Sequence, residues 1–495
     1  MSATTTSRST LIPPALPLVV QVSACAASVV LWAFSPDSPA AVESWIYGLC
    51  VFFTALYAWS AYSWYVTTGK LFDFYQLFLL AVALFHGGQA FLEVFGLNHD
   101  GFLESKFSDN VALQTMLVTT MCFTALHLGA LLAVKTHGAP CSLPNIDIRE
   151  QREADLRLVG WGMLAVAIPF TLLGFRSLVG VVLSGGYMAL YQQDVSAGFG
   201  AIPKVLATFF MPGAMFLLAG SRLSRNSALF VAAIVCVFAM MQFFIGERHN
   251  GALALVSLAW LWHRTIKPLN PTVLLGGALV MGMIVFPLVR ATRETSGSER
   301  TSTEQMIERY VSIENPAVSA VHEMGGSVYT LAYTMTLVPS EREYDLGESY
   351  FFAILTLFPN LIWEVHPSIA KGIPGDWLSW IVDPYSAARG AGFGYSLFGE
   401  AYLNFGSLGG AAFMLFFGWA YAAFTLWADR PGHPARWAFA ASMAFFFLFI
   451  ARSEFAIVVR GIAWYSFIPF WIAVTLLPAW RTWTARHETR RRVVA

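Results

Sequence analysis

Five arginines stand at the ends of strongly apolar stretches, where a charged side chain is costly unless it has a partner. They are Arg248, Arg290, Arg293, Arg452 and Arg460. Lysine is nearly absent beside them, and only arginine has a planar, permanently charged fork that binds phosphate through two hydrogen bonds at once. Each one alone could pair with a neighbouring acid or reach lipid headgroups. Together they predict a site for an anionic, lipid-borne group such as a diphosphate.

A glycine-rich segment is the second place where chemistry is expected. Residues 390–406 read GAGFGYSLFGEAYLNFG, with Glu400 near the middle. Glycine lacks a Cβ, so the backbone here can approach a ligand or another helix closely. The glycines expected to do so are Gly392, Gly394 and Gly399. The alternative is a helix-packing motif of small residues in which Glu400 is a solvated helix cap.

The elements that must position these residues are membrane helices. Of the 495 residues, 57% are hydrophobic and 12% charged, whereas roughly a quarter are charged in soluble domains. Apolar runs long enough to cross a bilayer predict an all-α, polytopic transmembrane bundle of about twelve spans. The expected spans are 16–34, 44–66, 72–96, 111–134, 158–183, 203–221, 227–246, 250–265, 271–289, 403–427, 436–452 and 459–480. The run 350–363 is too short to span.

The positive-inside rule orients the bundle with both termini in the cytoplasm. Every short connection on that side then carries at least one Lys or Arg, and the first outside loop, 35–43, carries none. The five arginines then lie at the outer ends of their helices. Three regions follow, which are a bundle of nine spans at 1–289, a large and partly helical outside cap at 290–402, and three spans with a basic tail at 403–495.

The glycine-rich segment also carries a resemblance to a known family. From Gly394 to Gly406 it is similar to the G-x-S-x-x-G-E-x-Y-x-N-F-G signature of Wzy-type O-antigen polymerases, the oligosaccharide repeat-unit polymerases. The helix end Gly246-Glu247-Arg248 and the segment 322–327 look like further shared blocks. The likeness covers roughly residues 240–460 and extends to the number of spans and the long outer loop.

The resemblance implies a glycosyltransferase on the periplasmic face of a bacterial inner membrane. It would join undecaprenyl-diphosphate-linked repeat units into O-antigen, capsule or exopolysaccharide, with lipid-linked sugar as both donor and acceptor. Undecaprenyl diphosphate would be the leaving group. The family implies no metal and no cofactor. A chain-length regulator and a flippase are expected partners beside membrane lipid, and nucleic acid is not expected.

That reaction divides the work between two kinds of residue. The arginines would stabilise the negative charge that develops on the departing diphosphate. A carboxylate or imidazole must take the proton of the acceptor hydroxyl. Glu400 is the first candidate for this base, and the alternatives are His322, Glu323 and His249.

Three other functions use similar chemistry. An O-antigen ligase would share the arginines but move a finished glycan onto a lipid A core, and the Gly-Glu block favours a polymerase. Mannosyltransferases that use a polyprenyl monophosphate share a pair of acidic residues in the first outer loop. The first outer loop of this chain, residues 35–43, holds no such pair. A transporter or flippase would place charges at mid-membrane along a path. Only Arg176 and Pro212 are mild candidates for that role.

Overall fold

The computed structural model describes residues 15–98, 101–137, 146–192, 198–222, 224–293, 303–358 and 363–494. Throughout these ranges the regular structure is helical and no strand occurs. The described part contains eleven helical segments that are long and apolar enough to cross a membrane. They are Ala15–Ala33, Ala41–Thr68, Phe74–Val94, Asp109–His137, Glu150–Gly185, Ile202–Gly220, Arg225–Ile245, Pro271–Ala291, Leu397–Ala428, Pro434–Arg452 and Phe455–His487. The prediction of an all-α polytopic bundle is confirmed.

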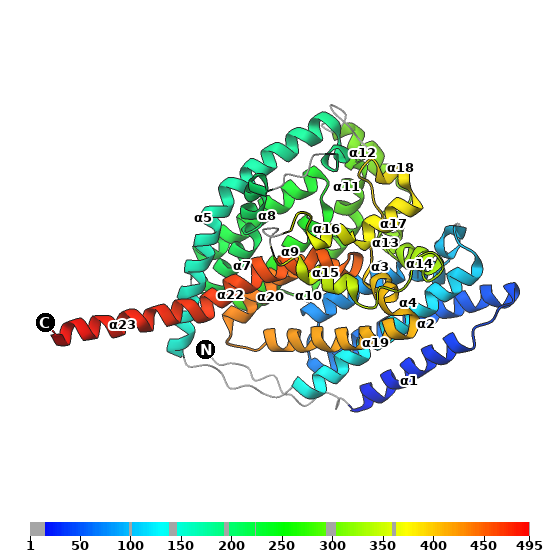
Figure 1. The fold of residues 1–495 in the computed structure, drawn as a ribbon, viewed down its shortest axis with the longest axis horizontal. Helices are drawn as coiled ribbons and strands as arrows, with labels where there is room; N and C mark the ends of the chain where they lie inside the picture. The colour runs from blue at the N-terminus through cyan, green and yellow to red at the C-terminus, as the bar shows by residue number, and fades with distance from the viewer. Residues whose placement is uncertain are drawn as a thin grey trace.

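The predicted spans correspond to helices of the bundle (Figure 1). In chain order these are α1 (Ala15–Ala33), α2 (Pro39–Thr68), α3 (Phe74–Val94), α4 (Asp109–His137), α5 (Ile146–Gly185), α6 (Ile202–Ala207), α7 (Phe210–Gly220), α8 (Arg225–Ile245), α9 (Arg248–Thr265), α10 (Pro271–Val280), α11 (Phe286–Arg293), α19 (Leu397–Ala428), α20 (Pro434–Phe447), α21 (Phe455–Arg460), α22 (Ile468–Trp471) and α23 (Leu477–Val494). Several spans are therefore built from consecutive short helices.

The one predicted span that differs is 250–265. It forms α9, a helix of 18 residues that is not among the eleven. The helix begins at Arg248 and includes His263 and Arg264 in its last turn, so polar groups occupy both of its ends and shorten its apolar part. Its two ends nevertheless lie at two different charged regions of the molecule, described below.

Close helix contacts at glycine hold the bundle together. A Cβ added at Gly418 of α19 would lie 1.9 Å from the carbonyl oxygen of Leu126 on α4. One added at Gly129 of α4 would lie 1.9 Å from the carbonyl oxygen of Leu415 on α19. The two backbones touch because neither glycine has a side chain, which is a common way for membrane helices to pack.

The region between α11 and α19 is partly helical. Its described helices are α12 (Thr303–Val311), α13 (Pro316–Gly325), α14 (Val328–Leu337), α15 (Glu348–Leu355), α16 (Pro367–Lys371), α17 (Pro374–Val382) and α18 (Pro384–Ala387). In Figure 1, α12, α13, α14, α17 and α18 gather on the side of the bundle away from the protruding α23. α15 has only 8 residues, too few to cross a bilayer.

A second glycine contact fixes α13 against α3. A Cβ on Gly325 would lie 2.8 Å from the backbone nitrogen of Gln89, and one on Gly88 would lie 2.8 Å from Cα of Gly325. The close approach brings the α13 side chains, Glu323 among them, to the same wall as Phe85 of α3. This contact helps to shape the cavity described next.

Candidate functional site

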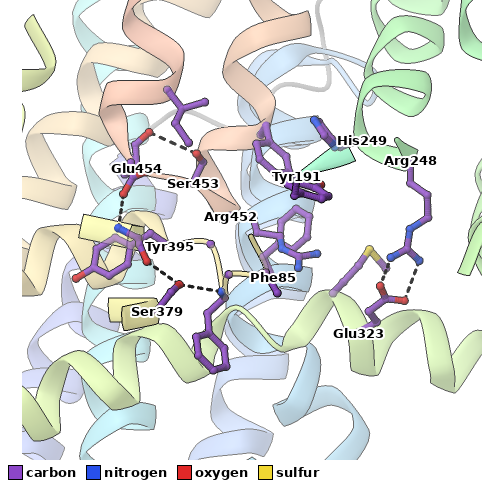
Figure 2. Close-up of a pocket in the computed structure, with 18 of the residues that line it drawn as sticks. Phe85, Tyr191, Arg248, His249, Glu323, Ser379, Tyr395, Arg452, Ser453 and Glu454 are labelled. Atoms are coloured by element: carbon purple, nitrogen blue, oxygen red, sulfur yellow. Dashed lines mark hydrogen bonds and ion pairs between the residues drawn. The ribbon is translucent and has the colours of Figure 1, made fainter. Parts of the chain in front are cut away.

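A cavity of about 530 Å³ opens between α9, α11, α13, α17, the glycine-rich segment and the junction of α20 with α21. Figure 2 shows part of its lining. The polar residues that line it are Tyr187, Tyr191, Arg248, His249, Arg293, Glu323, Asp376, Ser379, Tyr395, Arg452, Ser453 and Glu454. Its apolar wall includes Phe85, Met188, Phe286, Phe449 and Ile457. We call this space the arginine cavity.

Three of the five arginines singled out from the sequence meet in this cavity. Arg248 begins α9, Arg293 ends α11, and Arg452 ends the 3₁₀ turn Leu448–Arg452 that follows α20. Burial, followed by the charges of Arg293 and Arg452, lowers the pKa of Arg248 to about 9. The Arg248 guanidinium stays charged at neutral pH. The positive charges of Arg293 and Arg452, which come from two other helical segments, therefore act on it within the same cavity.

Arg248 is paired with an acid. Its Nη1 donates to Oε2 of Glu323 at 2.8 Å, and its Nη2 contacts Oε1 of the same carboxylate. Figure 2 shows this two-pronged pair bridging α9 and α13. Arg–carboxylate pairs of this geometry are strong and directional. The pair therefore fixes the position of Arg248 at the wall of the cavity.

Arg293 is held by a carbonyl group and an aromatic ring. Its Nε and Nη2 donate to the carbonyl oxygen of Gly246, at 2.9 Å and 2.6 Å. Its guanidinium lies over the ring of Tyr187, 4.3 Å from the ring centre. The Tyr187 and Tyr191 hydroxyls lie 2.7 Å apart. These contacts orient the cation without neutralising it.

Arg452 has no ion-pair partner in the part of the chain that the structure describes. It lies between the Arg248–Glu323 pair and the residues around Glu454 in the view of Figure 2. The acids that line the cavity are Glu323, already paired, and Asp376 and Glu454, whose pKa values burial raises. None of these three acids forms an ion pair with Arg293 or Arg452 within the described residues.

Glu454 is a buried carboxylate in the wall of the cavity. Its Oε2 accepts a hydrogen bond from the backbone N–H of Gly375 at 2.7 Å, and the residue is 2% exposed. Burial raises its pKa to about 8, and the charges of Glu400 and Asp376 add to the effect. A carboxyl with a pKa near the working pH is suited to proton transfer.

The glycine-rich segment forms one wall of the arginine cavity. The Oγ of Ser379 on α17 accepts from the N–H of Phe393 at 3.2 Å and donates to the carbonyl oxygen of Gly375 at 2.8 Å. A Cβ on Gly392 would lie 3.1 Å from that Oγ. Gly392 and Gly394 thus line the cavity with backbone, as their lack of side chains suggested.

Two of the five arginines lie elsewhere. Arg290 is exposed and donates to Oγ of Ser319 at 2.9 Å. It lines a separate cavity of about 380 Å³ with Arg309 and Ser312. Arg460 is exposed and donates through Nε and Nη2 to the carbonyl oxygen of Thr356 at 3.1 Å and 2.9 Å.

Other residues expected at the site also stand outside the cavity lining. His322 Nε2 lies 2.6 Å from Oε1 of Glu104. Gly399 lies in the first turn of α19, where its N–H donates to Oγ of Ser396 at 3.1 Å. His249, named from the sequence as an alternative base, does line the cavity. It stacks on Phe449, and burial lowers its pKa to about 4, so the imidazole is neutral at pH 7.

Glu400 is buried one layer behind the cavity. Its Oε1 accepts from the Ser349 hydroxyl at 2.7 Å, and its Oε2 accepts from the backbone N–H of Phe455 at 2.8 Å. Asn404 completes this network by donating to Oγ of Ser349 at 2.8 Å. Glu400 therefore ties α19 and α15 to the first residue of α21, which directly follows Glu454.

Four residues that line the cavity were not predicted from the sequence, and they are Tyr187, Tyr191, Ser379 and Glu454. A signal existed for Glu454, since the polar run Arg452-Ser453-Glu454 separates two apolar stretches. An acid two residues after Arg452 also looks like an ion-pair partner of that arginine. No comparable signal marks the two tyrosines, because their place at the cavity depends on how residues 187–191 fold back after α5.

The fold and the site together define a polytopic helical membrane protein with a cavity lined by three arginines from separate helical segments. The family model for O-antigen polysaccharide polymerase Wzy matches residues 19–482, which is nearly the whole chain. The chain therefore belongs to the Wzy family of O-antigen polymerases. No curated protein and no solved structure matches it.

Proposed function

We propose that this protein is a glycosyltransferase that polymerises undecaprenyl-diphosphate-linked oligosaccharide repeat units on the periplasmic face of the inner membrane. The observation that carries the proposal is the convergence of Arg248, Arg293 and Arg452 in one cavity. Membership of the Wzy family supports polymerase activity. The product is a polysaccharide of the O-antigen, capsule or exopolysaccharide type.

The cavity suits a diphosphate at the head of a lipid. Arg452 has no ion-pair partner among the described residues, and Arg293 is held by the carbonyl oxygen of Gly246 and the ring of Tyr187. Fixed cations in a partly dry site stabilise the charge that develops on a leaving diphosphate, because they need not reorganise during the reaction. The apolar wall formed by Phe286, Phe449 and Ile457 offers contacts to the first part of a polyprenyl chain.

The sugar end has its own surface in the same cavity. Tyr187 and Tyr191 stack edge to face with ring centres 5.4 Å apart. Aromatic rings give apolar contact area, and their hydroxyls give hydrogen bonds, which together fit the faces and edges of a sugar. The repeat unit would lie between these rings and the glycine-rich wall.

An O-antigen ligase is the second candidate, because the arginine cavity serves a diphosphate leaving group equally well in both reactions. Family membership favours the polymerase. A transporter is less well supported, because Arg248, Arg293 and Arg452 belong to one cavity and do not form a path along the bundle.

The test uses purified protein and lipid-linked repeat units extracted from a strain that lacks it, with lipid A core added in one parallel reaction and liposomes in another. Products are separated on a gel and stained for glycan. A ladder of regularly spaced bands supports the polymerase. Transfer to a lipid A core without a ladder would support the ligase, and movement of substrate across liposomes without any new glycan bond would support the transporter.

A further inference from the structure

The junction between α20 and α21 carries two charged residues of opposite kinds. Arg452 ends the turn Leu448–Arg452, Ser453 follows, and Glu454 precedes the first residue of α21. Both Arg452 and Glu454 line the arginine cavity. In Figure 2 Glu454 extends toward Ser379 and Tyr395, and Arg452 lies nearer to the Arg248–Glu323 pair. A glycosyl transfer needs a cation at the leaving group and a base at the acceptor, and one junction supplies both types.

The two carboxylate oxygens of Glu454 have different surroundings. Oε2 accepts from the N–H of Gly375 at 2.7 Å. Within the described ranges Oε1 has no hydrogen-bond partner, and no cation lies within ion-pairing distance of either oxygen. One oxygen is thus used to hold the carboxylate in place, and the other remains available to a ligand in the cavity.

Three of the competing candidates for a base, Glu323, Glu400 and His322, are engaged or displaced. Glu323 is bound through both oxygens to Arg248. Both oxygens of Glu400 accept hydrogen bonds within the protein, and this side chain does not line the cavity. His322 is bound to Glu104 and also lies outside the lining.

We propose that Glu454 is the base that takes the proton of the acceptor hydroxyl, and that Glu400 is a positioning residue that holds the Glu454 backbone. This inference rests on the proposed function. In the step, the acceptor oxygen bonds to the anomeric carbon of the donor sugar, and the bond from that carbon to the diphosphate oxygen breaks. The electron pair leaves with the lipid diphosphate beside Arg452, and the hydroxyl proton moves to Oε1 of Glu454. Loss of that proton to water restores the carboxylate.

The raised pKa of Glu454, about 8, gives the step a pH signature. Only the deprotonated carboxylate is a base, so kcat/KM should fall as the pH drops below that value and level off above it. The direction follows from the sign of the shift. An unperturbed carboxyl would stay ionised over the same range and give a flat profile.

The decisive variant is Glu454→Gln, because an amide oxygen can still accept from Gly375 N–H but the side chain cannot take a proton. We expect polymerisation of extracted lipid-linked repeat units to fall by about 10²–10⁴-fold. Binding of polyprenyl diphosphate, followed by intrinsic tryptophan fluorescence, should change by less than about twofold. Glu454→Asp should keep a reduced rate and the same downward limb of the pH profile.

Two further variants complete the test. Glu341→Gln changes an exposed acid outside the cavity lining and is the matched control, with unchanged rate and pH profile. Glu400→Gln retains an oxygen that can accept from the Phe455 N–H, so this variant should keep most of the activity. Glu400→Ala should lower kcat, and its kcat/KM should still fall as the pH drops.

The possible results distinguish the role of Glu454 as the base from the proposed polymerase function. If Glu454→Gln makes polymer at the wild-type rate, or if wild-type kcat/KM is flat between pH 6 and 9, Glu454 is not the base. If the wild-type protein makes no polymer and does not bind polyprenyl diphosphate, the proposed function fails instead.

Discussion

The two ends of α9 and α19 differ in whether nearby cations are paired with an acid. α9 begins at Arg248 in the arginine cavity and ends beside Arg264, and α19 begins near Glu400 and ends before Asp429. At the far end Asp429, whose side chain is 1% exposed, contacts Lys70 and lies 2.7 Å from Nη2 of Arg264. The cations there are matched by a buried acid. In the cavity Arg452 has no such acid among the described residues.

This difference separates structural from functional charge. Asp429, which follows α19, contacts Lys70 in the α2–α3 connection and Arg264 in α9. These ion pairs stabilise the packing of the helices. A cation left without an acid in a cavity is costly for the fold and persists where a ligand supplies the missing negative charge. The comparison makes predictions that differ between the two ends.

The largest effect is expected at the cavity end. Arg452→Ala removes a cation beside the leaving diphosphate, and each fixed donor of this kind contributes about 10²–10³-fold to rate. In a strain that depends on this protein, long surface polysaccharide should disappear while the amount of protein in the membrane stays normal. Polymer of normal length in the presence of the variant would remove Arg452 from the mechanism.

The opposite pattern is expected at the far end. Asp429→Asn leaves Lys70 and Arg264 facing each other without their acid. Breaking a buried pair costs about 3–5 kcal/mol, and partial exposure of the two cations reduces this to about 2–3 kcal/mol. Thermal unfolding of the detergent-purified protein should shift downward. Activity per folded molecule should be retained, and a loss of activity without a loss of stability would break the comparison.

A smaller effect is expected from freeing a cation in the cavity. Glu323→Gln removes the negative charge that Arg248 now contacts, so a diphosphate no longer competes with an internal acid. Affinity for polyprenyl diphosphate should rise by about tenfold, which corresponds to about 1.4 kcal/mol. Titration of purified variant and wild-type protein measures it. Equal or weaker binding would mean that the pair mainly orients Arg248.

The smallest effects are expected for the two exposed arginines. Arg290 and Arg460 contact Ser319 and a backbone carbonyl outside the arginine cavity. Substitution of exposed residues usually changes stability by no more than about 0.5 kcal/mol. Arg290→Ala and Arg460→Ala should therefore leave polymer amount within about threefold of wild type on a glycan gel. Complete loss of polymer in either strain would extend the functional site beyond this cavity.

Much of the fold could be predicted from hydropathy alone. Eleven long apolar segments overlap eleven of the predicted spans, with ends that differ by up to eight residues, because lipid demands continuous apolar helices whatever the tertiary packing. The exception was α9, whose polar ends make it a marginal span. The helices between residues 303 and 387 were expected only in outline, since their apolar faces are short and meet partners distant in sequence.

The candidate site was predictable only in part. Charge at helix ends pointed to Arg248, Arg293 and Arg452, and it pointed equally to Arg290 and Arg460. Arg290 and Arg293 are three residues apart on α11 and line different cavities, a distinction that depends on the neighbours of that helix. Glu400 attracted attention as the acid of a motif, whereas Glu454 had only a short polar junction to mark it.

The sequence by itself determined that this chain is a bundle of membrane helices with arginines at their ends, because apolar length and charge position are local properties. The tertiary structure alone decided which arginines share a cavity and which acidic side chains line it. These depend on glycine contacts such as Gly88 with Gly325, which bring segments more than two hundred residues apart to one wall. A local pattern cannot specify a meeting between distant backbones.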